Sequence, residues 1–381
     1  MSSPVSDIDL HAHLIGQQGG RRALNTPVLV VDIDVLARNI QSMAAFAAEH
    51  GLALRPHAKT HKSADIARMQ IAAGAVGVCS AKLGEAEAMA NGEVDSILIT
   101  SPVVTAPGIE RLIALNQRIG DLRVVTDNPT NVQALMNAAT TEKPLQVLVD
   151  IDPGIRRTGV ASPEAALALA KQIAAAPSLR FLGVQYYCGR EQHIEAWADR
   201  VDAMKKRTAY LKGIVDQLNA AGLSPQVITG GGTGTHRIDA DLGVLNELQT
   251  GSYVFMDRQY NDCDLTGDGV TPFETSLFVD ARVVSANTPG MATIDAGFKA
   301  MATDGGPPTI LSGAPEGAVY HFMGDEHGAI VAADATFAIG DAVTLAVPHC
   351  DPTVNLYDHY HVVSHDTLVR IWPVQARGRS R

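Results

Sequence analysis

The 381-residue chain has few cysteines, and no two of them lie close together in the sequence. The four are Cys79, Cys188, Cys263 and Cys350, so there is no Cys-x-x-Cys pair and a disulfide framework is not expected. No apolar run reaches the roughly 18 residues that span a membrane, and the start of the chain lacks the apolar core of a signal peptide. These absences predict a soluble protein in the reducing cytoplasm.

Positive charge is also scarce, because 30 lysines and arginines face 41 aspartates and glutamates, for a net charge of −11. Nucleic acid and anionic membranes are therefore not expected as partners. One basic stretch stands out against this background, and we interpret it as the local positive site that an anionic substrate would need. It contains Arg55, His57, Lys59, His61 and Lys62.

Short apolar runs alternate with alanine-rich segments of helical period through the first two thirds of the chain. The segments between the runs are typical of helices that cover a parallel sheet. Eight such units predict a (β/α)8 barrel of the TIM type. A doubly wound sheet is the alternative, but its first strand–helix turn is normally glycine-rich and here it is not. The expected strands are 52–56, 76–81, 96–100, 122–127, 146–151, 181–187, 226–230 and 247–254.

Beyond about residue 262 the helical period fades and short β-type runs separated by turn residues follow, which predicts a second, all-β domain. One more strand is expected at 28–31, ahead of the barrel, where it can pair with that domain. We therefore predict three parts. They are an N-terminal segment 1–32 whose strand joins the β-domain, a barrel 33–262 and a β-domain 263–381 that carries a metal site.

Polar residues follow nearly every predicted barrel strand. Taken singly, each is more often an ordinary loop residue than a functional one. The carboxyl ends of barrel strands meet at one face, however, so residues in this phase are expected to form one site. The residues in phase include His57, Lys59, Ser80, Lys82, Ser101, Asp127, Arg157, Tyr187, His193, Gln249, Gly251, Ser252 and Tyr253.

Three features of this set predict a pyridoxal-phosphate (PLP) enzyme. Lys59 stands among other cations, which depress the pKa of a lysine and free its amine to form a Schiff base; a solvated basic turn is the simpler alternative. The glycine run 230–234 follows the seventh strand, where barrels of this kind bind phosphate through backbone N–H groups. His349 and Asp351, on either side of Cys350, face one side of an extended backbone and suit Zn, Mn or Mg, although a turn braced by Asp351 is also possible.

Several motifs taken together resemble the D-threonine aldolase family, which includes D-3-hydroxyaspartate aldolases and has eukaryotic-type D-serine dehydratases as relatives. The resemblance covers nearly the whole chain, from Thr26 to Arg379. It implies the fold of alanine racemase, with a PLP-binding barrel, a β-domain and a homodimer whose sites lie at the subunit interface. The motifs are Arg55–Lys62, Gly230–Gly234, Leu248–Tyr253, Asp295–Gly297, Asp325–Gly328 and His349–Thr353.

The resemblance also implies roles for individual residues. Lys59 is the Schiff-base lysine, and Gln249 stands where alanine racemases carry an arginine opposite the pyridine nitrogen. Arg157 corresponds to an arginine near the phenolate side of the cofactor, and Tyr187 to a tyrosine that lines its ring. The phosphate cradle is Gly231, Gly232, Thr233, Gly251 and Ser252; His57 and Tyr253 complete the expected cofactor-binding set; and His349 and Asp351 are the expected metal ligands.

The predicted reaction is retro-aldol cleavage of a D-3-hydroxy amino acid to glycine and an aldehyde or glyoxylate. The metal lowers the pKa of the β-hydroxyl group, and a base such as His193 takes its proton. The alternative on the same fold is a dehydratase that eliminates the hydroxyl group. A PLP carrier without activity and a metal-dependent hydrolase without PLP are more distant alternatives, and the metal pair argues against the carrier. The cluster Asp325-Glu326-His327 lines the same cleft or braces a loop.

Overall fold

Eight parallel strands form one sheet in the larger part of the molecule, which a computed structural model describes over residues 5–381. The sheet order is β2-β9-β8-β7-β6-β5-β4-β3, and His57 pairs with Cys79 where its two ends meet. The sheet is thereby curled into a barrel, so the predicted barrel is confirmed and the doubly wound alternative is wrong. The strands are β2 (Ala53–Leu54), β3 (Val78–Ser80), β4 (Ser96–Ile99), β5 (Asp121–Thr126), β6 (Leu145–Asp150), β7 (Leu179–Tyr186), β8 (Val227–Gly230) and β9 (Glu247–Leu248).

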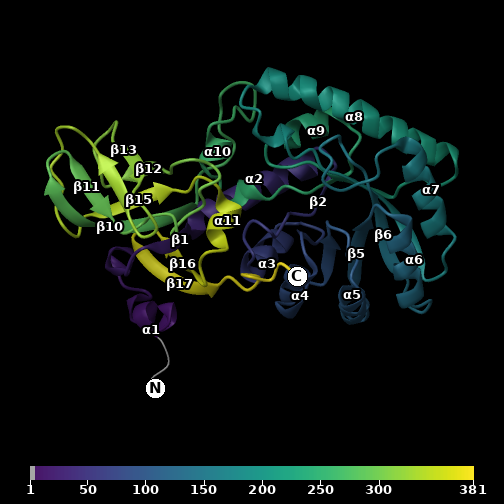
Figure 1. Ribbon diagram of the computed structural model, residues 1–381, viewed down its shortest axis with the longest axis horizontal. Coiled ribbons are helices and arrows are strands. Elements are labelled where there is room, and N and C mark those ends of the chain that lie inside the picture. The colour runs from purple at the N-terminus through teal and green to yellow at the C-terminus, as the bar shows by residue number, and fades with distance from the viewer. Residues whose placement is uncertain (1–4) are drawn as a thin grey trace.

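Helices follow the barrel strands and cover the outside of the sheet (Figure 1). Several begin where a small polar side chain accepts a backbone N–H of the first turn, as Ser63, Thr105, Asn128 and Ser162 do. The expected strand 247–254 ends early, because residues 252–254 turn into a 3-10 helix. The helices are α2 (Ile33–Glu49), α3 (Ala64–Ala72), α4 (Leu83–Asn91), α5 (Ala106–Arg118), α6 (Pro129–Ala138), α7 (Pro163–Ala174), α8 (Trp197–Ala220), α9 (His236–Leu242) and α10 (Arg258–Asn261).

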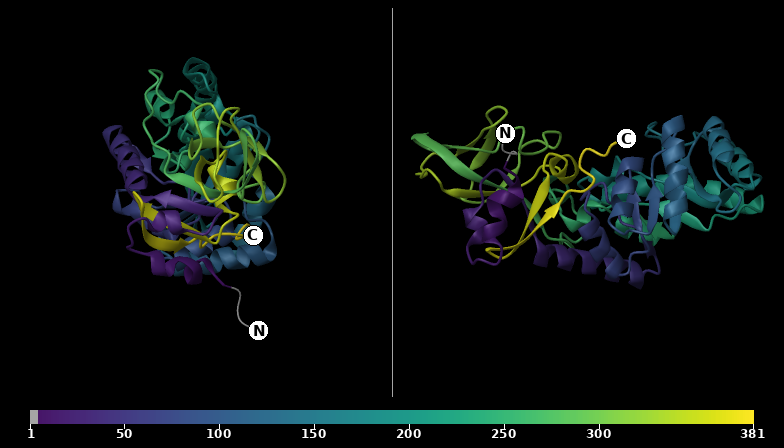
Figure 2. Two further views of the ribbon diagram at one scale, coloured as in Figure 1. Left: turned by 90° about the vertical axis from the view of Figure 1, so that its left-hand side faces the viewer. Right: turned by 90° about the horizontal axis from the view of Figure 1, so that it is seen from below.

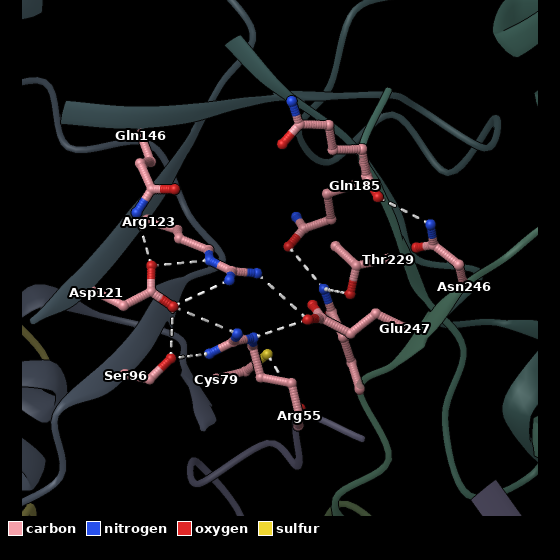
Figure 3. A network of polar contacts seen from close by, with 12 residues as sticks. Arg55, Cys79, Ser96, Asp121, Arg123, Gln146, Gln185, Thr229, Asn246 and Glu247 are labelled. Atoms are coloured by element: carbon pink, nitrogen blue, oxygen red, sulfur yellow. Dashed lines mark hydrogen bonds and ion pairs between the residues drawn. The ribbon is translucent and has the colours of Figure 1, made fainter. Parts of the chain in front are cut away.

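A network of charged side chains fills the amino-terminal end of the barrel (Figure 3). Arg55 is fully buried and donates from Nε to Glu247 (3.0 Å) and from Nη1 to Ser96 (2.8 Å). Arg123 contacts both Asp121 (3.0 Å) and Glu247 (3.3 Å). A separate apolar layer also lies in the barrel, made of Cys79, Leu98, Val125, Leu148 and Leu182. The end of the barrel with the network is therefore occupied by paired charges.

The basic stretch does not form one positive site, so that interpretation is wrong. Arg55 points into the barrel network, and Lys62 is buried against Glu85. His61 is buried as well, and desolvation lowers its pKa to about 4. Burial of these side chains against acidic or neutral partners removes them from the surface that a substrate would meet.

We expect Arg55→Met to lower the free energy of unfolding by about 3 kcal/mol, because it leaves the buried Glu247 with one cationic partner instead of two. Urea unfolding followed by circular dichroism measures the change. The matched control is Arg38→Met, whose pair with Glu274 has side chains 56% and 60% exposed, and we expect a loss below about 1 kcal/mol there. Equal losses of unfolding free energy in the two variants would contradict the assignment of a larger stabilising role to the buried Arg55–Glu247 pair.

A second, mixed sheet of nine strands forms the smaller part of the molecule (Figures 1 and 2). Its main order is β13-β14-β11-β10-β1-β16-β17, and β15 joins β10 to β12. β1, which precedes the barrel, pairs antiparallel with β10 and parallel with β16. Strands from both ends of the chain, β1 and β16–β17, thus share this sheet with the strands that follow the barrel. The strands are β1 (Val28–Asp32), β10 (Leu277–Thr288), β11 (Met291–Ile294), β12 (Thr309–Ser312), β13 (Val319–Phe322), β14 (Gly328–Val331), β15 (Ala342–Ala346), β16 (His359–Ser364) and β17 (Thr367–Pro373).

Some elements of the smaller part were not predicted from the sequence. β12 is largely exposed, so it lacks the alternation of apolar and polar residues that marks a half-buried strand, and the strands β13 and β16 were also missed. A short helix, α11 (Cys350–Val354), and a helical N-terminal segment that includes α1 (Asp7–His11) lie beside this sheet, which is therefore not purely β. Within residues 5–381 no helix has the length and apolarity needed to cross a membrane.

Candidate active site

A cavity of about 510 Å³ opens at the carboxyl ends of the barrel strands. Loops from all around the barrel contribute to its wall, as the phase of the polar residues predicts. The predicted residues that line it are His57, Lys59, Arg157, Tyr187, Gly232, Thr233, Gln249, Gly251 and Ser252.

Lys59 lies in this cavity, and its Nζ contacts Oδ1 of Asp351, a residue of α11 in the smaller part of the molecule. Burial disfavours the charged amine, but the carboxylate of Asp351 outweighs it and holds the pKa of Lys59 above its usual value. The prediction of a depressed pKa is therefore wrong for this state, because the neighbouring cations point elsewhere and a carboxylate faces the amine. This contact brings the predicted Schiff-base lysine and the predicted metal pair into one site.

One end of the cavity is lined by the glycine loop and by the turn that follows β9. Gly231 has a φ of +71°, which favours glycine, and Thr233 Oγ1 accepts the backbone N–H of Tyr253 (2.9 Å) and so ties the two loops together. In residues 5–381 no acceptor contacts the backbone N–H of Thr233, Gly251 or Ser252. Free N–H groups on adjoining loops are what a phosphate anion binds.

The end of the cavity lined by the glycine loop and the turn after β9, here called the phosphate end, also has no room for a side chain larger than glycine at position 251. A Cβ at Gly251 would lie 2.7 Å from Thr60 Oγ1, and that hydroxyl is buried without a partner in the described part of the chain. The residues present therefore fit the phosphate of PLP, with unused donors at one end of the cavity and Lys59 inside it.

The predicted metal pair is close together, although not in the conformation expected. The backbone is not extended through 349–351, because α11 begins at Cys350. The backbone N–H of Cys350 donates to Asp257 Oδ2 (2.8 Å). His349 Nε2 lies 3.9 Å from Asp351 Oδ2, while His349 Nδ1 is hydrogen-bonded to Asp304 Oδ2 (2.8 Å).

The donor set of this pair fits a divalent cation. An imidazole whose other nitrogen donates to a carboxylate is the usual arrangement of a metal-binding histidine. Among residues 5–381 no third His, Cys, Asp or Glu completes a cluster with His349 and Asp351, so water or substrate would fill the remaining positions. Cys350 between them is buried, and its Sγ lies 3.4 Å from Asp351 Oδ2.

The family model for the alanine racemase N-terminal domain matches residues 31–259, and one for a serine dehydratase domain matches 276–363. A 3-hydroxy-D-aspartate aldolase of Paracoccus denitrificans is 38% identical over 361 residues, which are 93% of each chain. The crystal structure of D-threonine aldolase from Filomicrobium marinum superposes with a TM-score of 0.90 at 36% identity, over 94% of this chain and 97% of that one. The chain belongs to the D-threonine/3-hydroxy-D-aspartate aldolase family.

As a member of this aldolase family, the chain is an enzyme of the D-threonine aldolase type, a carbon–carbon lyase. Its alanine racemase-like fold is confirmed by the same comparisons. A mutant D-threo-3-hydroxyaspartate dehydratase, solved in a metal-free form, superposes with a TM-score of 0.80 at 27% identity, over 93% of this chain and 98% of that one.

Besides the metal pair His349 and Asp351, three residues predicted for the aldolase site lie beside the cavity and not in its wall. His193 is exposed, and its ring packs at a tilt against Tyr260, which does line the cavity (4.5 Å between ring centres). Desolvation and the nearby His349 and Lys59 lower the pKa of His193 to about 4, so it is neutral near pH 7. The Tyr253 hydroxyl is buried and accepts a hydrogen bond from Gln70 (3.0 Å), and Gly231 lines a smaller space next to Cys188.

Sequence reasoning missed several residues of the aldolase site. Thr60, Thr100 and Gln185 line the cavity in the phase of the strand ends, which was a usable signal. Asp304 lies in the long loop between β11 and β12, far from His349 in the sequence, and no pattern marks it. The cluster Asp325-Glu326-His327 braces a hairpin instead of lining the cleft, with Glu326 paired to Lys299 (2.6 Å) at the surface.

Proposed function

We propose that this enzyme cleaves D-3-hydroxy amino acids by a PLP- and divalent-metal-dependent retro-aldol reaction, giving glycine and an aldehyde or glyoxylate. The observation that carries the proposal is the contact between Lys59 and Asp351, which places a lysine of the barrel and a possible metal ligand of the β-domain at one cavity. Both groups are then available to a single substrate.

The barrel residues would hold the cofactor. Lys59 would bind its aldehyde carbon, and the N–H groups of Thr233, Gly251 and Ser252 would bind its phosphate. Arg157 and Tyr187 are stacked, with the guanidinium 5.6 Å from the ring centre, and would form a wall beside the cofactor ring. When bound, PLP supplies an electron-accepting ring that stabilises the charge left at Cα when the Cα–Cβ bond breaks.

The β-domain residues would hold the metal. His349 Nε2 and Asp351 would bind Mn, Mg or Zn, and Asp304 would keep the imidazole in the required tautomer and orientation. A divalent ion supplies Lewis acidity that lowers the pKa of the β-hydroxyl group. His193, neutral near pH 7, would accept the released proton or pass it to solvent.

Product analysis tests this proposal. Purified protein loaded with PLP and Mn would be given D-threonine and D-3-hydroxyaspartate separately. We expect glycine with acetaldehyde from the first or with glyoxylate from the second, and the faster reaction identifies the preferred side chain. If neither substrate yields glycine, the proposed reaction is wrong.

The second candidate is β-elimination, which is the activity named for the related dehydratase structure. It is favoured by the position of Lys59 next to the metal pair, because its amine could take the α-proton while the metal assists loss of the hydroxyl group. Ammonia and a 2-oxo acid in the same product assay would establish this reaction instead.

We further propose that the enzyme acts in the cytoplasm as a homodimer with sites at the subunit interface, as the likeness to alanine racemases implies. Light scattering during size-exclusion chromatography tests the assembly. A fully active monomer would contradict it.

We expect Asp304→Asn to weaken metal binding by about 10- to 100-fold, because the hydrogen bond that orients His349 loses its carboxylate acceptor. Calorimetric titration with Mn measures the affinity, and the cofactor absorbance should stay unchanged. The control is Asp262→Asn, an exposed carboxylate that lies near Arg258 instead (3.5 Å). Unchanged Mn affinity in Asp304→Asn would contradict this role.

A further inference from the structure

A row of buried polar side chains crosses four neighbouring barrel strands just below the cavity. Asp150 at the end of β6 is the cross-strand neighbour of Gln185 on β7, and Gln185 is the neighbour of Thr229 on β8. Gln249 follows β9 and completes the row. Each of the four residues is at most 4% exposed, so their hydrogen bonds are made within the protein and not with bulk water. Figure 3 shows Gln185 and Thr229 in this row.

The orientation of the Gln185 amide follows from its neighbours. Its Nε2 lies 2.9 Å from Asp150 Oδ1 and 3.2 Å from the main-chain oxygen of Thr100. A main-chain carbonyl only accepts hydrogen bonds, so the group of Gln185 that faces Thr100 must be the NH2. Burial raises the pKa of Asp150 to about 6, but the need for a donor at Thr100 remains whether Asp150 is charged or neutral. The carbonyl oxygen of Gln185 must therefore face Gln249.

The same reasoning then sets the orientation of Gln249. Its Nε2 lies 3.2 Å from Gln185 Oε1, which can only accept, and 3.1 Å from Thr229 Oγ1. The NH2 group is thus used below the cavity. The carbonyl oxygen Oε1 is left over, because both side-chain hydrogen bonds of Gln249 within residues 5–381 are made by Nε2, while Gln249 itself lines the cavity. A ligand that meets this oxygen must bring a hydrogen-bond donor.

We propose that Gln185 is a positioning residue that turns the carbonyl oxygen of Gln249 toward the cofactor and so holds the ring nitrogen of PLP in its protonated form. The inference rests on the proposed function, in which PLP binds this cavity with its nitrogen opposite Gln249. The proton comes from water and binds the nitrogen lone pair. Arginine at this position would offer only donors and would hold the nitrogen unprotonated.

The protonation state bears on the reaction. A protonated ring withdraws electrons more strongly than a neutral one, so it better stabilises the carbanion that remains after the Cα–Cβ bond breaks. The amide orientation set by Gln185 therefore favours cleavage, although Gln185 takes no part in the chemistry itself.

The test is 15N NMR of the holoenzyme reconstituted with PLP labelled at the ring nitrogen. We expect the wild-type resonance near that of a pyridinium reference compound. Gln249→Glu, which offers only acceptors when ionised, should keep that position, whereas Gln249→Arg should move the resonance to that of neutral pyridine. Gln185→Leu should move it part of the way, because the Gln249 amide is then free to turn over.

The matched control is Gln146→Leu, since Gln146 also points into the barrel but hydrogen-bonds Asp121 at its opposite end (2.7 Å). Its resonance should equal that of the wild type. A neutral-pyridine resonance in the wild type would overturn the inference while leaving the proposed function intact. An unchanged resonance in Gln185→Leu would overturn the positioning role, and failure of the wild type to bind PLP would overturn the inference together with the proposed function.

Discussion

Lys59→Ala is expected to lower aldolase activity by about 10⁴-fold or more and to abolish the visible absorbance of a lysine-bound cofactor. The amine of Lys59 is the only lysine nitrogen among residues 5–381 that contacts Asp351, and it lies inside the cavity with the free N–H groups of the phosphate end. Without it no covalent link to the cofactor forms, and the group that aligns cofactor and substrate is lost. Absorbance spectra and steady-state rates measure the two effects.

Lys82→Ala is the matched control, because Lys82 lines the same cavity from the loop after β3. We expect Lys82→Ala to keep the absorbance of the bound cofactor. Loss of that absorbance in Lys82→Ala and its retention in Lys59→Ala would transfer the role to Lys82.

His349→Ala is expected to lower activity by about 10³-fold or more and to remove the response to added Mn, because a Lewis acid at the substrate oxygen contributes several kcal/mol to catalysis. The cofactor absorbance should remain, since His349 does not line the barrel cavity. Rates with and without Mn, before and after chelation, measure the effect. Chelation should reduce the wild-type rate to that of the variant.

The control for this variant is His327→Ala, an exposed histidine on a hairpin of the same domain. It should respond to Mn and to the chelator as the wild type does. If chelation still slows His349→Ala by a large factor, the metal is bound elsewhere.

The two predictions address different parts of one site. Removal of Lys59 should abolish both the absorbance and the reaction, whereas removal of His349 should abolish the reaction alone. A protein that loses both signals in both variants would have lost its fold at the boundary between barrel and β-domain, which circular dichroism would detect.

Most of the barrel was predictable from the sequence because its signals are local. Parallel strands buried on both faces read as short apolar runs, and the helices between them carry their own caps. The same locality placed His57, Lys59 and Gln249 at the cavity, since each follows a strand in the same phase. The exposed strand β12 carries no such pattern and was missed, as were the short strand β13 and the buried strand β16.

Tertiary structure alone decided how the site is assembled, because those contacts join residues far apart in the sequence. Lys59 meets Asp351 only because β1 and the C-terminal strands share a sheet that sets α11 against the barrel mouth. Asp304 reaches His349 from a loop without any motif. Local sequence determined that the residues after the barrel strands, such as His57, Lys59 and Gln249, stand at the cavity. The charge that faces Lys59 and the amide orientation of Gln249 depend on buried partners from other strands, and only the folded chain brings those partners within hydrogen-bonding distance.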